Sequence, residues 1–256
     1  MPQIDTVGTN YYAPLALMDR IGGGLFWAVS ILSVVTLLID KAAYPQASIG
    51  VQIAFLIAAL LFFVHGLVQN LYLFPRAEDA RRRQVLSNSF DVALTHEETV
   101  GYYNNDQKDP LRRLAANSME SVFFTRSIVR RMLRWQRITT LGYLVVWIAF
   151  MAHRQTDLEM IGVVAQAIFS GEILGRWLRM EWLHSRCDTV FNDFNILFNG
   201  SRKSQKPVDR AQIIELFAHY ETTKATAAIL ASTKIFDDQN EALTAEWERI
   251  RARLGI

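Results

Sequence analysis

The sequence predicts an all-α integral membrane protein, with four transmembrane helices arranged as two hairpins and with cytosolic helical extensions. The apolar runs come in two pairs, at 21–39 with 49–74 and at 138–152 with 160–171. Arginine crowds one end of every run, and the polar stretches between and after the pairs leave the soluble mass on a single side.

The first pair of runs carries the clearest membrane signal. The stretch 22–39 holds no charged residue and ends at Asp40 and Lys41. A hydrocarbon core of ~30 Å needs about 20 helical residues, so this stretch is long enough to cross. The run 49–74 is longer and contains only four strongly polar side chains, Gln52, His65, Gln69 and Asn70. We expect both segments to span a bilayer.

The second pair of runs is shorter. The run 138–152 has about 15 apolar residues and the run 160–171 about 12. Short runs also suit buried core helices, because charge at membrane depth is costly. The brief connection at 153–159, the flanking arginines and the belt-like placement of Trp177 and Trp182 favour spanning.

Basic residues near the segment ends predict the orientation. The outer side carries only Lys41 and Arg154, so the positive-inside rule places both termini of a multi-pass membrane protein in the cytoplasm. The inner side carries Arg20, Arg76, Arg81, Arg82, Arg83, Arg130, Arg131, Arg134, Arg137, Arg176 and Arg179. The predicted parts are a cytosolic N-terminal segment (1–20), a first hairpin (21–75), a cytosolic helical region and stalk (76–137), a second hairpin (138–178) and a cytosolic C-terminal helical region (179–256).

Composition and motifs exclude most enzyme classes. The chain of 256 residues has a net charge of +2 and one cysteine, Cys187, which excludes an internal disulfide framework. It has no phosphate-binding Gly-x-x-x-x-Gly-Lys-Ser/Thr loop, no Gly-x-Ser-x-Gly elbow and no His-Glu-x-x-His pair. The run His96-Glu97-Glu98 is interpreted as a solvated charge cluster. We therefore expect no enzymatic activity, no cofactor and no metal.

The cytosolic helices have local signals. Asp109-Pro110 predicts an N-cap and a helix that runs to residue 152, and another helix is expected after Pro75. The stretch 208–254 is helical by pattern and needs a partner surface, either the central stretch or a neighbouring subunit. Five arginines fall on one face of the long helix, within about 80° at 100° per residue: Arg112, Arg126, Arg130, Arg134 and Arg137. They meet lipid phosphates or cytosolic acids in the simplest interpretation, and line a vestibule or hold an anionic ligand in the alternative.

Short motifs in the central stretch and tail resemble one family. They are Gln84 with Phe90-Asp91, the turn Tyr102-Tyr103-Asn104-Asn105-Asp106, the helix start at 110–118, Phe123-Phe124-Thr125-Arg126, and the tail motifs at 220–225, 235–236 and 243–247. This set is similar to the SMODS-associated four-transmembrane effector family of bacterial antiphage (CBASS-like) systems, and to the related Hailong-type membrane effector. The turn departs from the family pattern, because it has Tyr-Tyr-Asn-Asn-Asp where the family has tryptophan and proline.

The resemblance implies a membrane effector that is encoded beside a nucleotidyltransferase. Such an effector forms a pore or ion channel controlled by a nucleotide or oligonucleotide, disrupts the inner membrane and arrests infected cells. The predicted ligand site combines cations with stacking rings, which suits a polyanion: Arg112, Arg126, Arg130, Arg134, Tyr102 and Tyr103. We expect a homo-oligomer, with a tetramer favoured, because four helices alone enclose too little space for a pore. The sequence leaves open the ligand's identity and whether it opens or closes the pore.

Polar residues within or beside the membrane runs are the predicted pore or gating residues. They are His65, Gln69, Gln166, Ser170, Glu172 and Arg137. The structural alternatives are helix–helix hydrogen bonding for His65, tight helix packing around Gln166 and Ser170, and a self-neutralising pair of Glu172 with Arg176. Two other functions remain open: a non-channel membrane scaffold that recruits a partner, and a small secondary transporter that uses His65, Glu172 and Arg176.

Overall fold

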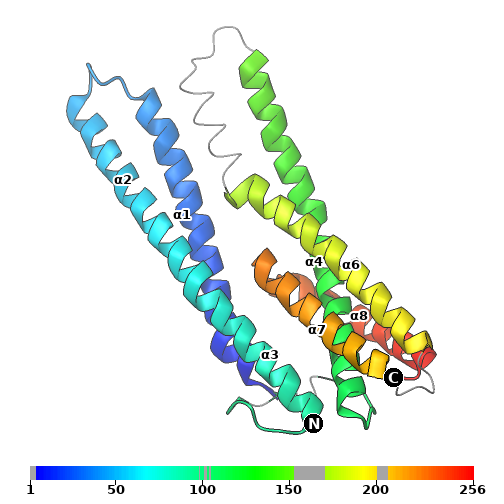
Figure 1. The fold of residues 1–256 in the computed structure, drawn as a ribbon. Coiled ribbons are helices and arrows are strands. Elements are labelled where there is room, and N and C mark those ends of the chain that lie inside the picture. The colour runs from blue at the N-terminus through cyan, green and yellow to red at the C-terminus, as the bar shows by residue number, and fades with distance from the viewer. Residues whose placement is uncertain (1–3, 98, 101–102, 104, 153–170, 201–206) are drawn as a thin grey trace. The chain divides into compact units, whose positions relative to one another are not determined.

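The chain folds almost entirely into helices (Figure 1), and this confirms the all-α class. The computed structural model describes residues 4–97, 99–100, 103, 105–152, 171–200 and 207–256. Its elements are β1 Ile4–Asp5, η1 Gly8–Tyr12, α1 Ala13–Leu38, α2 Pro45–Val68, η2 Gln69–Leu73, α3 Phe74–Phe90, β2 Thr99–Val100, α4 Pro110–Ala152, η3 Gly171–Gly175, α6 Arg176–Gly200, α7 Pro207–Ala227 and α8 Thr233–Leu254. The two short strands pair antiparallel, with Ile4 opposite Val100.

The chain divides into two compact units. Unit 1 comprises 1–13, 75–134 and 179–256, and unit 2 comprises 14–74 and 135–178. Unit 2 therefore contains α1, α2, η2, the second half of α4, and η3. Each unit is described below by itself.

Two described helical stretches are long and apolar enough to cross a membrane, Gly8–Leu38 and Pro45–Phe90. Only 11% and 6% of their most apolar windows are buried, whereas the core helix of a soluble protein is mostly buried. This finding supports the first predicted hairpin. The run 138–152 does not pass the same test, and most of the run 160–171 lies outside the described residues, so four spans are not shown.

The helical backbone continues through Pro75, where we had expected a new helix to start. It runs from Pro45 to Phe90, and the π-helical turn η2 lies just before the proline. In an α-helix the proline ring would clash with the carbonyl of Leu71 and leave it without its donor. A π turn widens the hydrogen-bond ladder by one residue at this point, with the Phe74 amide donating to the Gln69 carbonyl, and so accommodates Pro75.

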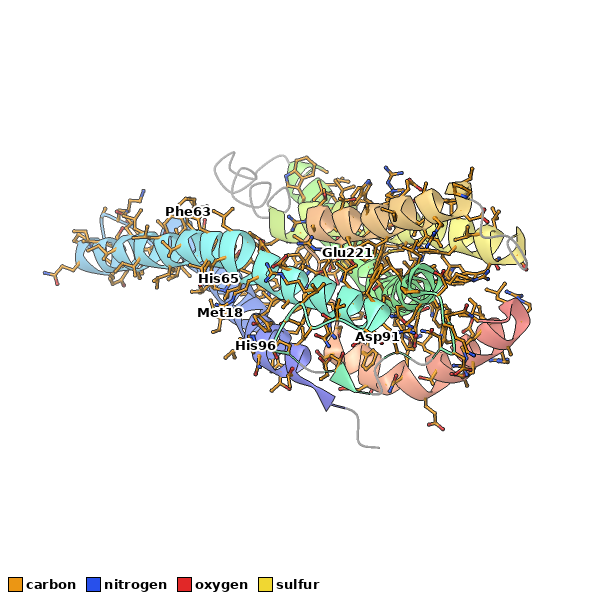
Figure 2. The ribbon with its side chains drawn as sticks, turned by 60° about the horizontal axis from the view of Figure 1, so that its bottom comes forward. Met18, Phe63, His65, Asp91, His96 and Glu221 are labelled. Atoms are coloured by element: carbon orange, nitrogen blue, oxygen red, sulfur yellow. The ribbon has the colours of Figure 1, made fainter. Side chains whose placement is uncertain are left out.

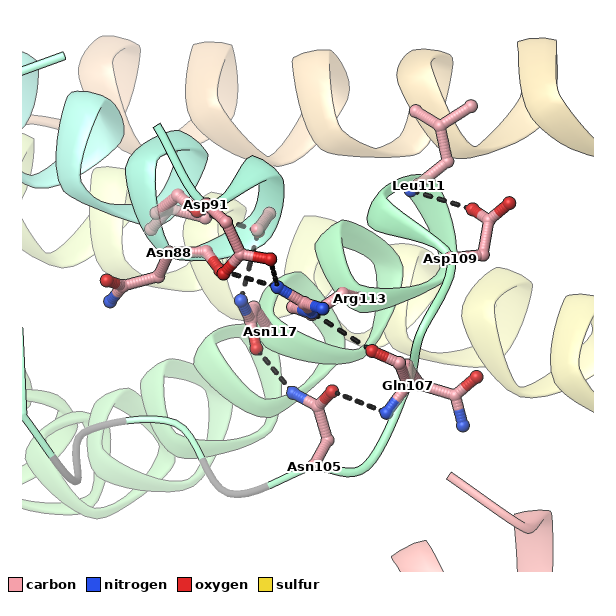
Figure 3. Close-up of polar contacts among 10 residues, drawn as sticks. Asn88, Asp91, Asn105, Gln107, Asp109, Leu111, Arg113 and Asn117 are labelled. Atoms are coloured by element: carbon pink, nitrogen blue, oxygen red, sulfur yellow. Dashed lines mark hydrogen bonds and ion pairs between the residues drawn. The ribbon is translucent and has the colours of Figure 1, made fainter. Parts of the chain in front are cut away.

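The start of α4 confirms the predicted N-cap. The Asp109 carboxylate accepts hydrogen bonds from the amides of Leu111 at 2.9 Å and Arg112 at 3.1 Å, which satisfies two donors that the first turn leaves open (Figure 3). From Pro110 the helix runs to Ala152, as the sequence predicts.

The C-terminal tail packs on the central stretch, one of the two surfaces expected for it. Trp247 of α8 is buried with its ring 5.9 Å from that of Phe123 on α4, and Phe236 lies 6.0 Å from Phe124. The tail forms two helices, whereas the sequence pattern suggested helix throughout 208–254. The break falls where Ala228 takes a positive φ of 48° and Ser232 caps α8.

Candidate functional site

Two of the four predicted ligand arginines are held by contacts within unit 1. The guanidinium of Arg126 lies 4.1 Å from the ring centroid of Phe191 and 3.4 Å from a carboxylate oxygen of Asp188. The guanidinium of Arg112 lies 5.9 Å from the ring centroid of Phe198. Both partners belong to α6, so these arginines fasten α4 to its neighbour.

The other predicted ligand residues are placed differently. Arg130 and Arg134 are exposed, and Tyr103 is half-buried. Tyr102 lies outside the described residues, so the structure does not show whether the two tyrosines come together beside an arginine. The predicted ligand-binding role of this set stays a prediction.

The triplet Arg81, Arg82 and Arg83 meets carboxylates of its own unit. Arg81 pairs with Asp5 at 2.9 Å, and its side chain is 12% exposed. Arg82 and Arg83 both pair with Asp79 on the preceding turn of α3. These ion pairs give the triplet an intramolecular role, most clearly for the largely buried Arg81.

A buried charged cluster joins three elements of unit 1. Lys224 of α7 places its Nζ 2.7 Å from Glu78 Oε2 on α3, and the Tyr12 hydroxyl donates to Glu78 Oε1 at 2.8 Å. A second carboxylate, Glu221, is buried one turn before Lys224. Burial is the largest single effect on Lys224 and would lower its pKa, but the surrounding acidic groups, Glu78 first, together raise that pKa well above its ordinary value.

Burial is the main influence on the pKa values of Glu221 and of the Cys187 thiol. Burial raises the pKa of Glu221, although Lys224 acts in the opposite direction. Burial also raises the pKa of the Cys187 thiol to about 12, which keeps it protonated and unreactive. The cluster is therefore suited to holding helices together and is poorly suited to nucleophilic chemistry.

A second polar network gathers several residues that carry the family resemblance. Arg113 donates to Asp91 at 2.6 Å and to the carbonyl of Gln107 at 3.0 Å (Figure 3). Asn117 donates to Ser89 at 3.0 Å and accepts from Asn105 at 2.6 Å. The network ties the end of α3 and the loop before α4 to the first turns of α4.

The N-terminal segment is fastened to the same unit. Asn10 donates to both carboxylate oxygens of Glu97, at 3.3 and 3.2 Å. Hydrogen bonds from Thr6 first and from Asn10 lower the pKa of Glu97, with a further contribution from His96. Glu97 is thus a buried acceptor for the N-terminal segment, whereas the sequence suggested a solvated cluster around it.

In unit 2, His65 makes the helix–helix hydrogen bond given above as its structural alternative. Its Nε2 lies 2.8 Å from the carbonyl oxygen of Met18, so the ring donates through this nitrogen from α2 to α1 (Figure 2). Gly22 permits the close approach, because a Cβ at that position would lie 2.6 Å from the His65 ring. His65 is buried even though the apolar side chains around it are largely exposed.

Asp19, one residue after Met18, contacts two polar side chains. Gln69 donates to it at 3.4 Å and the Arg176 guanidinium approaches it at 3.5 Å. The sequence suggested Glu172 as the partner of Arg176, and the structure gives it Asp19. Among the other predicted pore residues, Glu172 is half-buried and Arg137 exposed, while Gln166 and Ser170 lie outside the described residues.

The structure thus adds residues that the sequence reasoning did not single out as sites. Asp19, Glu78, Lys224 and Glu221 are the main ones, and all are charges within apolar or helical patterns. Asp19 offered a signal, because it precedes the first apolar run. Within the described ranges, no three His, Cys, Asp or Glu side chains are placed to hold a metal ion. The chain matches no family model, no curated protein and no solved structure, so its function has to be argued from the residues themselves.

Proposed function

We propose that this chain is the membrane effector of a bacterial antiphage system, a multi-pass inner-membrane protein whose pore or channel is controlled by a nucleotide or oligonucleotide. The observation that carries the proposal is the composition of unit 2. Its helices α1 and α2 expose apolar side chains along most of their length. Within this apolar setting His65 contacts the Met18 carbonyl, and Gln69 and Arg176 both contact Asp19.

That arrangement suits a gated conduit better than a passive anchor. Ionisable groups inside membrane proteins face other helices or a wet cavity, and they mark paths for ions or protons. A passive anchor would need none of them. Asp19 and Arg176 carry opposite charges 3.5 Å apart, so breaking their contact would expose charge to a conduction path.

Control by an anionic ligand is placed on unit 1, in keeping with the family resemblance. Because Arg112 and Arg126 are held by α6, the proposal does not require all four predicted arginines to face the ligand. Cytosolic helices that join the membrane helices without a break give the bound ligand a route to the first hairpin. The proposed assembly is a homo-oligomer, with a tetramer favoured.

The test is conductance with a defined partner. The full chain is reconstituted in vesicles loaded with a self-quenched dye and then exposed to the product of a neighbouring nucleotidyltransferase. We expect dye release or membrane depolarisation to change when this product is added. Vesicles that stay sealed both with and without the product would overturn the pore.

A matched pair of variants links conductance to unit 2. Asp19→Asn should alter the conductance, because it removes the charge that faces Arg176. Asp40→Asn is the control, since Asp40 caps the exposed turn after α1 through the amides of Ala42 and Ala43. Equal conductance in both variants would argue for a membrane scaffold. Native mass spectrometry that showed only monomers would contradict the oligomer.

A further inference from the structure

One exposed face of α4 changes from cationic to apolar within a single turn. Its first part carries Arg130, Arg134 and Arg137, all exposed. Its second part carries Ile138, Leu141, Val145 and Ile148, whose exposed fractions are 65%, 64%, 58% and 58%. At 100° per residue these seven side chains fall within an arc of about 100°, so they form one continuous stripe.

An aromatic residue marks the change of character. Trp135 is 73% exposed and lies along the helix between Arg134 and Ile138, to one side of the stripe. Arg131 is also exposed and widens the cationic part toward Trp135. The apolar part extends about 15 Å along the helix from Ile138 to Ile148, which is half the thickness of a hydrocarbon core.

We infer that this stripe, Arg130 to Ile148 on α4, binds an anionic lipid bilayer, with phosphates on the arginines, Trp135 at the interface and acyl chains on the apolar part. Cation, tryptophan and aliphatic residues follow the order of headgroup, interface and core. A protein partner would have to match two adjoining surfaces of opposite character. The inference rests on the membrane location in the proposed function. It assigns Arg130 and Arg134 to lipid, so the oligonucleotide of the proposed function would bind through other residues of unit 1.

The rest of the arginine set supports this division. Arg126, one turn before Arg130, turns to Asp188 and Phe191 of its own unit. Arg126 therefore serves an intramolecular contact, whereas the side chains of Arg130 and Arg134 are exposed. Each basic residue at an anionic surface contributes about 1 kcal/mol, or roughly fivefold in affinity, and this contribution is screened by salt.

The experiment measures retained lipid and needs no pore assay. The full chain in mild detergent is titrated with phosphatidylglycerol or phosphatidylcholine, and the bound lipid is counted by native mass spectrometry. The test variant is Arg130→Gln/Arg131→Gln/Arg134→Gln. The control variant is Arg210→Gln/Lys234→Gln/Arg249→Gln, which removes three exposed cations from α7 and α8.

We expect the wild type and the control to prefer phosphatidylglycerol, and the test variant to lose at least tenfold of that preference. Helical content and thermal unfolding should be unchanged, because the three substituted side chains are exposed. Equal lipid preference in the test and control variants would overturn the inference. Loss of oligomers in the test variant without any change in lipid preference would also overturn it, by making the stripe a contact between copies.

A parallel arm distinguishes lipid phosphate from ligand phosphate. Binding of a fluorescent single-stranded DNA oligomer is measured by anisotropy at low salt for the same variants. We expect the test variant to bind it as the control does. A selective loss of DNA affinity with lipid preference intact would assign the stripe to the ligand. A wild type that fails to enter phosphatidylcholine vesicles would instead refute the membrane location itself, and with it the proposed function.

Discussion

Replacing Lys224 by methionine should destabilise unit 1 through the charge it leaves behind. The side chains of Lys224 and Glu78 are 17% and 9% exposed, and their charged atoms lie 2.7 Å apart. Methionine fills a similar volume, so the main effect is to remove the cation that contacts the buried Glu78 carboxylate. Glu78 would keep only the Tyr12 hydroxyl as a described hydrogen-bond donor.

The magnitude follows from the geometry. Two unit charges 2.7 Å apart attract by about 6 kcal/mol at an effective dielectric constant of 20, and desolvation of both groups offsets much of this. Removing one partner of a buried pair typically costs 3–5 kcal/mol. We expect about 3 kcal/mol, at the lower end, because Lys224 retains some contact with water. For a chain of this size that corresponds to a fall of roughly 6–12 °C in the unfolding temperature.

The assay is thermal unfolding of the full chain in detergent at pH 7.5, with Lys234→Met on the exposed face of α8 as the control. The double variant Glu78→Gln/Lys224→Met should recover most of the loss, because a neutral amide can still accept the Tyr12 hydrogen bond. The reasoning fails if Lys224→Met unfolds within 2 °C of the wild type. It also fails if the double variant is no more stable than the single one.

Three further substitutions test other contacts by the same thermal assay. Gly22→Ala should lower the free energy of unfolding by about 1–3 kcal/mol, because the new Cβ would lie 2.6 Å from the His65 ring. The control Gly23→Ala meets nothing within 4 Å and should be neutral or slightly stabilising. Equal unfolding temperatures for the two variants would contradict the close approach of Gly22 and His65. Burial raises the pKa of Glu221 in the folded state, so its contribution to stability is lost as pH rises above about 4.5 and the buried carboxyl ionises. Glu221→Gln should therefore be more stable than wild type at pH 7.5 and no different at pH 4. A gain in stability that did not depend on pH would refute this sign. Arg126→Glu should destabilise unit 1 by about 2–4 kcal/mol, because it removes the contacts that join α4 to α6 and places a second negative charge beside Asp188. An unchanged unfolding temperature would leave Arg126 available for a ligand.

Local signals explain which parts of the fold could be predicted from the sequence. Asp109 and Pro110 set the start of α4, because a cap and a first-turn proline act within three residues. The apolar lengths of 22–39 and 49–74 predicted the first hairpin for the same reason. Ser232 is also a local cap, and it was the available signal for the break between α7 and α8.

The polar contacts could not be predicted, because they depend on distant partners. Glu78 and Lys224 are far apart in sequence, and each alone looks like an ordinary charge on a helix surface. Arg126 looked like a ligand residue because helical periodicity places it on the face of Arg130, but periodicity does not reveal that α6 presents Asp188 and Phe191 to it. His65 stood out in the sequence as a polar residue in an apolar run, but its hydrogen-bond partner, the Met18 carbonyl, lies on another helix and could not be identified from the sequence.

The π-helical turn at Gln69–Leu73 has a mechanical consequence for the long helix that contains it. A π turn places one more residue in the turn than an α turn does. If η2 rewound to α-helix, the segment before it would rotate by about 100° relative to the segment after it, one residue's step around the axis. Gln69, which contacts Asp19, lies at the start of this turn, and Glu78, which contacts Lys224, lies after it. The turn therefore separates, along one helix, a residue with a contact in unit 2 from a residue with a contact in unit 1. A change of twist there would alter the angular register between Gln69 and Glu78 while changing the length of the helix by only a fraction of a turn.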